Sequence, residues 1–185
     1  GGFAVAATRR YEDGDNQPLL VTTDAEGKNA ETTGFETDDA NRGQGILQTD
    51  DGGYLLLASE VAIRTTPSGQ ERWRTRLPEP SDQFFVARAV VPAHDDGYVV
   101  AGTLSYPTEC DDGNIYVAKL REDGELAWRN EIALSFEDEA NDIVRTESGY
   151  ALAGRICTGG TEQYNGLLLH LTEQGEGDWY RSYGG

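Results

Sequence analysis

The fold is decided by the stretch Ala118-Lys119-Leu120-Arg121-Glu122-Asp123-Gly124-Glu125-Leu126-Ala127-Trp128, in which an apolar run, a polar turn ending in glycine and a tryptophan follow one another. The arrangement recurs, so that a tryptophan stands four residues after a glycine at Gly69–Trp73, Gly124–Trp128 and Gly175–Trp179. Self-similarity of this kind is the sequence mark of a repeat protein. We therefore expect about four copies of one unit.

A second phrase places a glycine directly before an aromatic residue that begins an apolar run, at Phe3, Tyr54, Tyr98 and Tyr150. These aromatic residues are about 44 to 52 residues apart, close to the roughly 40–50 residues that a four-stranded propeller blade uses. The first copy is the weakest, because Glu31 stands where the tryptophan is expected after Gly27.

The last copy shows the unit most clearly, with strands expected at 141–146, 150–154, 167–171 and 179–183. Glycine- and aspartate-rich turns between them predict an antiparallel meander. We therefore predict an all-β fold, a β-propeller region over residues 1–185 with about four four-stranded blades at 1–38, 39–82, 83–135 and 136–185. The first blade should lack one strand, giving about fifteen strands. We expect a fragment of a larger propeller; a four-bladed ring and a half-ring that pairs with another copy are the alternatives.

Stacking such meanders side by side buries faces that a single sheet would leave exposed. Trp73, Trp128 and Trp179 are therefore expected to cover the seams between blades rather than to stack on a ligand. Tyr54, Tyr98 and Tyr150 are assigned a structural role as well.

Residues 62–73 and 118–128 resemble the tryptophan-docking repeat of quinoprotein-type, pyrroloquinoline-quinone-like β-propellers. The glycine–tyrosine phrase also resembles repeats of secreted and cell-surface propeller proteins of bacteria and haloarchaea. The resemblance implies a propeller, but a fold does not fix an activity. The cofactor pocket of true quinone enzymes, with its calcium site and stacking partners, has no counterpart in this sequence. A quinone-dependent oxidoreductase, or a lyase or glycosidase with clustered carboxylates, is therefore the alternative to a non-catalytic module.

The charge is strongly negative, with 33 acidic against 15 basic residues and a net charge of −18. Lys28 and Lys119 are the only lysines. A dense carboxylate coat with few lysines is typical of a halophilic protein, because molar salt shortens the screening length to about 3 Å. An acidic secreted domain is the alternative. Nucleic acid and anionic membranes are not expected as partners, and no apolar run approaches the ~20 residues of a membrane helix. We expect a location outside the cell or on the surface of a halophile, with the cytoplasm as the alternative.

The two cysteines, Cys110 and Cys157, fall in corresponding loops of neighbouring copies. A disulfide between the copies and two unpaired thiols are both compatible with this placement. Their spacing matches no metal-binding motif.

Four aspartates are weak candidates for a Ca²⁺ site, because oxygen ligands at alternate positions suit that ion: Asp13, Asp15, Asp111 and Asp112. The complete calcium loop with its distal glutamate is absent, so solvated turns are the simpler interpretation. His94 and His170 lie in different features, and no hydrolase or metalloprotease motif occurs. We expect no catalytic residue and no cofactor beyond this possible Ca²⁺. The predicted function is a non-catalytic propeller scaffold that binds a protein or glycan, with self-association as a further expectation.

Overall fold

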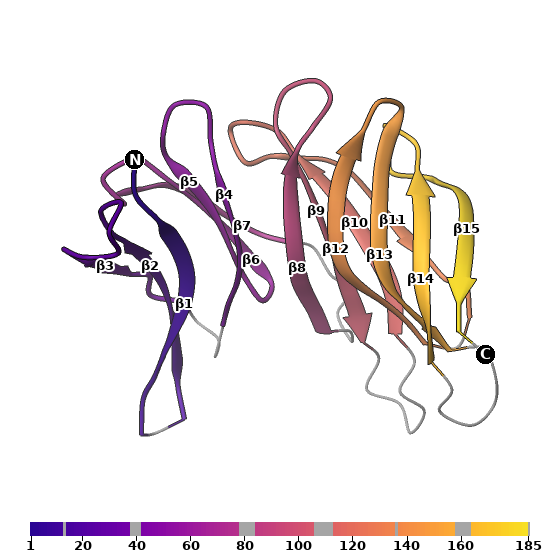
Figure 1. Cartoon of the computed structure of the whole chain (residues 1–185), viewed down its shortest axis with the longest axis horizontal. Helices are drawn as coiled ribbons and strands as arrows, with labels where there is room; N and C mark the ends of the chain where they lie inside the picture. Colours follow the sequence, from indigo (N-terminus) through magenta and orange to yellow (C-terminus); the bar gives the residue numbers. More distant parts are fainter. Residues whose placement is uncertain are drawn as a thin grey trace. The chain divides into compact units, whose positions relative to one another are not determined.

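The computed structural model describes residues 1–12, 14–37, 42–77, 84–105, 113–135, 137–157 and 164–184 (Figure 1). These residues form strands and no helix. The strands are β1 (Ala4–Arg10), β2 (Asn16–Thr22), β3 (Glu31–Gly34), β4 (Gly43–Gln48), β5 (Tyr54–Ala58), β6 (Val61–Thr65), β7 (Glu71–Arg76), β8 (Phe84–Pro92), β9 (Tyr98–Ser105), β10 (Gly113–Leu120), β11 (Leu126–Ile132), β12 (Asp138–Thr146), β13 (Gly149–Cys157), β14 (Tyr164–Leu171) and β15 (Gly177–Tyr183).

Consecutive strands pair antiparallel in four separate sheets, β1–β3, β4–β7, β8–β11 and β12–β15. The first sheet has three strands and the others have four. The predicted all-β architecture and the missing strand of the first copy are thus confirmed. The chain divides into an N-terminal unit, residues 1–76, and a C-terminal unit, residues 77–185, each of which contains two sheets.

The central strands of the β4–β7 and β8–β11 sheets are almost wholly buried, because these sheets carry apolar residues on both faces. The central strands of the β12–β15 sheet mix buried residues with half-buried and exposed ones. In the C-terminal unit, Val99 and Val117 of one sheet belong to the same core as Leu152 and Leu169 of the other. In the N-terminal unit, Leu20 packs in one core with Leu56 and other residues of the second sheet. Within each unit, the two sheets therefore pack face to face.

One turn recurs between the third and fourth strands, or their equivalents, in all four sheets. Its glycine N–H donates to the carbonyl three residues earlier, and its backbone lies in the left-handed region at Gly27 (φ 73°), Gly69 (80°), Gly124 (88°) and Gly175 (73°). Glycine adopts this conformation without the steric cost that a Cβ brings. The glycine of each tryptophan phrase is therefore required by the turn itself.

A bulge follows this turn in each four-stranded sheet, with register shifts at Arg64/Thr65, Lys119/Leu120 and His170/Leu171. The extra residue places each tryptophan directly opposite a basic residue of the preceding strand, in the pairs Arg64–Trp73, Lys119–Trp128 and His170–Trp179. Strands of the C-terminal unit also run further than predicted. Strand β13, expected at 150–154, continues to Cys157 because Arg155 and its neighbours pair with both flanking strands.

Candidate functional site

The seam between the two sheets of the C-terminal unit is filled by Trp128. This half-buried side chain, on β11, packs against the core that both sheets share. A Cβ at Gly175 would lie 2.3 Å from Cζ3 and 2.4 Å from Cη2 of the indole, so the ring lies directly on this glycine. Asn130 Nδ2 donates to the carbonyl oxygen of Gln174 at 2.8 Å. Strand β11 thus holds the turn of the following sheet through one indole and one amide.

The N-terminal unit has the same seam without the indole. Glu31 occupies the position of the tryptophan, and Thr33 occupies that of Asn130. The Thr33 hydroxyl would lie 2.8 Å from a Cβ at Gly69, the counterpart of Gly175. A groove of about 570 Å³ opens here, lined by residues 33–36, residues 68–71 and Arg74.

The C-terminal unit has a groove at the corresponding place, between β11 and β15. It measures about 350 Å³ and is lined by residues 131–134, Leu169 and residues 177–180. Gly175 is not part of this lining, because Trp128 covers it. The missing tryptophan therefore explains why the groove of the N-terminal unit extends to the glycine turn. We call that larger cavity the seam groove.

Charged side chains on one wall of the seam groove are fixed by one another. Arg74 donates from Nε to Glu71 Oε1 at 2.7 Å and from Nη2 to Oε2 at 2.6 Å. These hydrogen bonds hold the pKa of Glu71 below its usual value. The remaining Arg74 nitrogen, Nη1, donates to the backbone carbonyl of Glu36 on the other wall.

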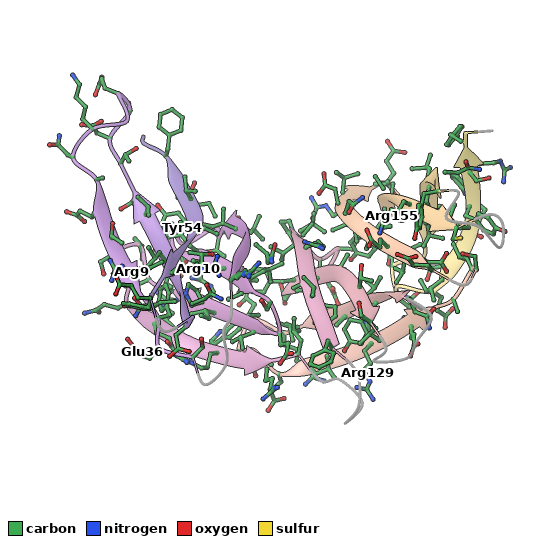
Figure 2. All side chains as sticks on the ribbon, turned by 90° about the horizontal axis from the view of Figure 1, so that it is seen from below. Arg9, Arg10, Glu36, Tyr54, Arg129 and Arg155 are labelled. Carbon is green, nitrogen blue, oxygen red and sulfur yellow. The ribbon has the colours of Figure 1, made fainter. Side chains whose placement is uncertain are left out.

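A buried glutamine supports the opposite wall. Gln17 donates from Nε2 to Glu36 Oε1 at 2.7 Å, and its own oxygen accepts from Arg9 Nη1 at 3.2 Å and from the Tyr11 hydroxyl at 3.0 Å. A Cβ at Gly34 would lie 2.8 Å from the Gln17 amide, so a side chain at this position would displace that amide. Figure 2 labels Arg9, which lies on β1, and Glu36, which follows β3. The Glu36 carboxylate is therefore held in place rather than free to rotate.

The basic residues opposite the tryptophans form a second repeated feature, which the sequence analysis missed. Arg64 is buried and donates from Nη2 to Asp51 at 2.5 Å, and Arg72 contacts the same carboxylate at 2.7 Å. Hydrogen bonds from Thr49, from the Gly53 backbone and from Arg64 hold the pKa of Asp51 far below its usual range. The signal was present in the sequence, since each basic residue stands two positions before the turn.

The two other sheets repeat this pairing with different residues. Lys119 donates to Asp95, and this hydrogen bond lowers the pKa of the Asp95 carboxyl. His170 Nδ1 lies 3.1 Å from Asp178, and its ring stacks on Trp179 with centroids 5.5 Å apart and planes at 6°. Lys119 thus joins β10 to the turn before β9, and His170 joins β14 to β15.

A polar cluster lies at one end of the β12–β15 sheet. Arg155 Nη2 contacts Glu137 at 3.0 Å and Glu139 at 2.6 Å, and its guanidinium lies 4.2 Å from the centre of the Tyr164 ring. The Tyr164 hydroxyl donates to Glu137, which raises the pKa of Tyr164 to about 12. Arg155 is labelled in Figure 2. The four side chains form an ion-pair cluster, in which Arg155 Nε is buried without a hydrogen-bond partner among the described residues.

The two histidines lie in different features of the C-terminal unit. His94 Nε2 is 2.9 Å from the Gly149 carbonyl oxygen, and its ring contacts Tyr150 edge-on at 5.4 Å. Its backbone N–H also donates to the Tyr150 hydroxyl at 3.3 Å. His170 stacks on Trp179 instead. Tyr98 is buried like Tyr150, whereas Tyr54 and Trp73 are half-buried.

The calcium and disulfide hypotheses rest mainly on residues outside the described part of the chain: Asp13, Cys110, Asp111 and Asp112. Asp15 is exposed in a turn, where its carbonyl accepts from the Tyr11 N–H at 2.9 Å. Cys157 is half-buried at the end of β13. Over the described residues, no three His, Cys, Asp or Glu side chains are grouped to hold a metal ion. Both hypotheses stay predictions.

No protein-family model and no curated protein sequence matches the chain. Among solved structures, a protein of unknown function from Bacteroides caccae superposes with a TM-score of 0.59 and 14% identity over 90% of this chain and 55% of that one. The WD40 domain of Pan2 from Neurospora crassa superposes with a TM-score of 0.62 and 13% identity over 97% of this chain and 50% of that one. WD40 domains are β-propellers built of four-stranded blades.

The fold is therefore that of a β-propeller, with the four sheets as its blades. The chain spans about half the length of these two structures. Within the described residues, no helix is long and apolar enough to cross a membrane.

Proposed function

We propose that this chain is a non-catalytic β-propeller module of a halophile, outside the cell or on its surface, that binds an extended segment of another protein in the seam groove. The observation that carries the proposal is the groove of about 570 Å³ lined by β3, the strand that has Glu31 in place of the repeat's tryptophan. In the C-terminal unit the tryptophan at this position, Trp128, packs against the core that two blades share.

A protein segment fits the groove because of the strands beside it. Within the described part of the chain, β3 pairs with β2 alone and so forms the edge of its sheet beside the groove. An extended peptide recognises such an edge through its own backbone. Glu36, Glu71 and Arg74 are held in place at the rim and supply side-chain selectivity.

The role of the charged residues also supports a scaffold. The carboxyls with lowered pKa values, Asp51, Glu71 and Asp95, each accept hydrogen bonds from a basic side chain. In an active site, such shifts prepare a group for proton transfer. Here the same shifts are explained by ion pairs within a blade, two of which join a turn to a central strand while the third lies within β7.

Filling the groove tests the proposal. The probes are peptides selected from a random display library on the wild-type chain. The selection is made in about 2–3 M KCl, where screening is strong. Glu31→Trp restores the repeat's indole and should abolish peptide binding, whereas the control Glu31→Gln removes the charge alone and should retain it. Peptides that bind Glu31→Trp as well as wild type would refute the site. Turnover, or a spectral change on adding pyrroloquinoline quinone with Ca²⁺, would refute the non-catalytic assignment.

A further inference from the structure

Within the described part of the chain, one face of the β12–β15 sheet carries exposed apolar side chains. Pairing across the sheet places Val144, Ala151, His170 and Trp179 in one row on this face. Val144 is 53% exposed and Trp179 is 42% exposed. Side chains of this kind are normally covered when they lie together on a sheet. We call this surface the C-terminal face.

The corresponding face of the preceding sheet, β8–β11, shows how a row of this kind is covered. The corresponding row in β8–β11 is Val91, Val99, Lys119 and Trp128. The β12–β15 sheet covers it, with Val99 fully buried in the common core and Trp128 seated on Gly175. The C-terminal face is therefore built to receive another blade that carries a glycine turn.

The chain itself carries such a blade. In the β1–β3 sheet, Gly27 has the same φ of 73° as Gly175, and no described atom lies within 4 Å of a Cβ placed there. On the face of this sheet that points away from β4–β7, Val5 is 50% exposed, and Phe3, just before β1, is 60% exposed. This sheet thus has an open glycine turn beside exposed apolar residues. We call this surface, made of Phe3, Val5 and the turn at Gly27, the N-terminal face.

We propose that the C-terminal face of one copy docks on the N-terminal face of a second copy, with Trp179 seated on the partner turn at Gly27. Charge complementarity supports this register. Arg181 holds the position of Asn130, and Glu26 holds that of Gln174, which Asn130 contacts in the C-terminal unit. Because Asn130 donates to the Gln174 backbone carbonyl, docking in the same way brings Arg181 to the backbone of Glu26, the residue that also carries the carboxylate.

The proposal is independent of the seam groove, because none of the residues that line the groove lies on either face.

Sedimentation velocity in about 2–3 M KCl tests the contact on the 185-residue chain. Wild type should associate with a mass of about twice 20.2 kDa. Trp179→Glu and Gly27→Ala should each weaken association by at least about thirtyfold, the effect of removing a central interface residue. Phe84→Glu is the control, since Phe84 is 62% exposed but lies on neither face, and it should leave association unchanged.

A charge exchange tests the register itself. Arg181→Glu should weaken association, and adding Glu26→Arg should restore it. Larger head-to-tail assemblies that dissolve with Trp179→Glu and Gly27→Ala would support the same contact. Any one of three results would overturn the proposal. The wild-type chain stays monomeric, or both variants associate as strongly as wild type, or Glu26→Arg does not restore the association that Arg181→Glu weakens.

Discussion

Substituting Gly175 with alanine should destabilise the C-terminal unit for two separable reasons. The first is the backbone, because at φ 73° an alanine costs about 1 kcal/mol in the left-handed region. The second is the indole, which the new Cβ would approach to 2.3 Å and must displace. Truncating a buried tryptophan costs about 3–5 kcal/mol. Since Trp128 is half-buried, we expect about 2 kcal/mol for its displacement and about 3 kcal/mol in total.

Gly27→Ala is the matched control. Gly27 has the same φ and the same turn, but a Cβ there meets open space. The backbone cost of about 1 kcal/mol should therefore be its whole effect. The double variant Trp128→Ala/Gly175→Ala completes the comparison. Without the indole, Gly175→Ala should add only about 1 kcal/mol, so the coupling between the two sites is about 2 kcal/mol.

The assay is a urea titration in concentrated KCl, followed by hydrogen exchange of peptides from β1–β3 and from β12–β15 at low protein concentration. Exchange reads each unit separately. Two results would refute the reasoning: a cost of Gly175→Ala no larger than that of Gly27→Ala, or strict additivity of Trp128→Ala and Gly175→Ala.

Three further predictions follow from the charges. At pH values above the usual pKa of an aspartate carboxyl, Asp51→Asn should lower the urea midpoint. Because the folded pKa of Asp51 is depressed, its advantage should shrink as pH falls below that range; a difference constant down to the lowest pH would contradict this. Ultraviolet titration should show a tyrosine ionising near pKa 12 that Tyr164→Phe removes and Glu137→Gln moves toward lower pH; an unchanged titration in Glu137→Gln would contradict the assigned hydrogen bond. The urea midpoint should rise from low salt to molar KCl, because screening reduces repulsion within a chain of net charge −18; a salt-independent midpoint would argue against halophilic adaptation.

The strand order could be predicted because two local signals repeat along the chain. The turn glycine and the tryptophan mark the third and fourth strands, and the glycine–aromatic phrase marks the second. Both signals arise from backbone geometry within one blade, so a single sequence contains them. The absence of tryptophan at Glu31 also indicated that the first blade was unusual.

Two features of the site depend on packing that the sequence does not express locally. The bulge shifts the register by one residue, so a simple alternation along 71–76 does not place Trp73 opposite Arg64. The seam groove arises from two segments about thirty-five residues apart, and its volume depends on how neighbouring sheets pack. Aligning the repeats position by position would have shown the basic row at Arg64, Lys119 and His170.

The most direct measurement of the docking of an indole on the next blade's turn is the proton NMR spectrum of Gly175. With Trp128 Cζ3 and Cη2 against this residue, its α-protons should be shifted strongly upfield by the ring current and should show nuclear Overhauser effects to the protons on both ring carbons. The α-protons of Gly27 should show neither effect in the monomer. An unshifted Gly175 resonance without these cross-peaks would contradict the packing of the blades described above.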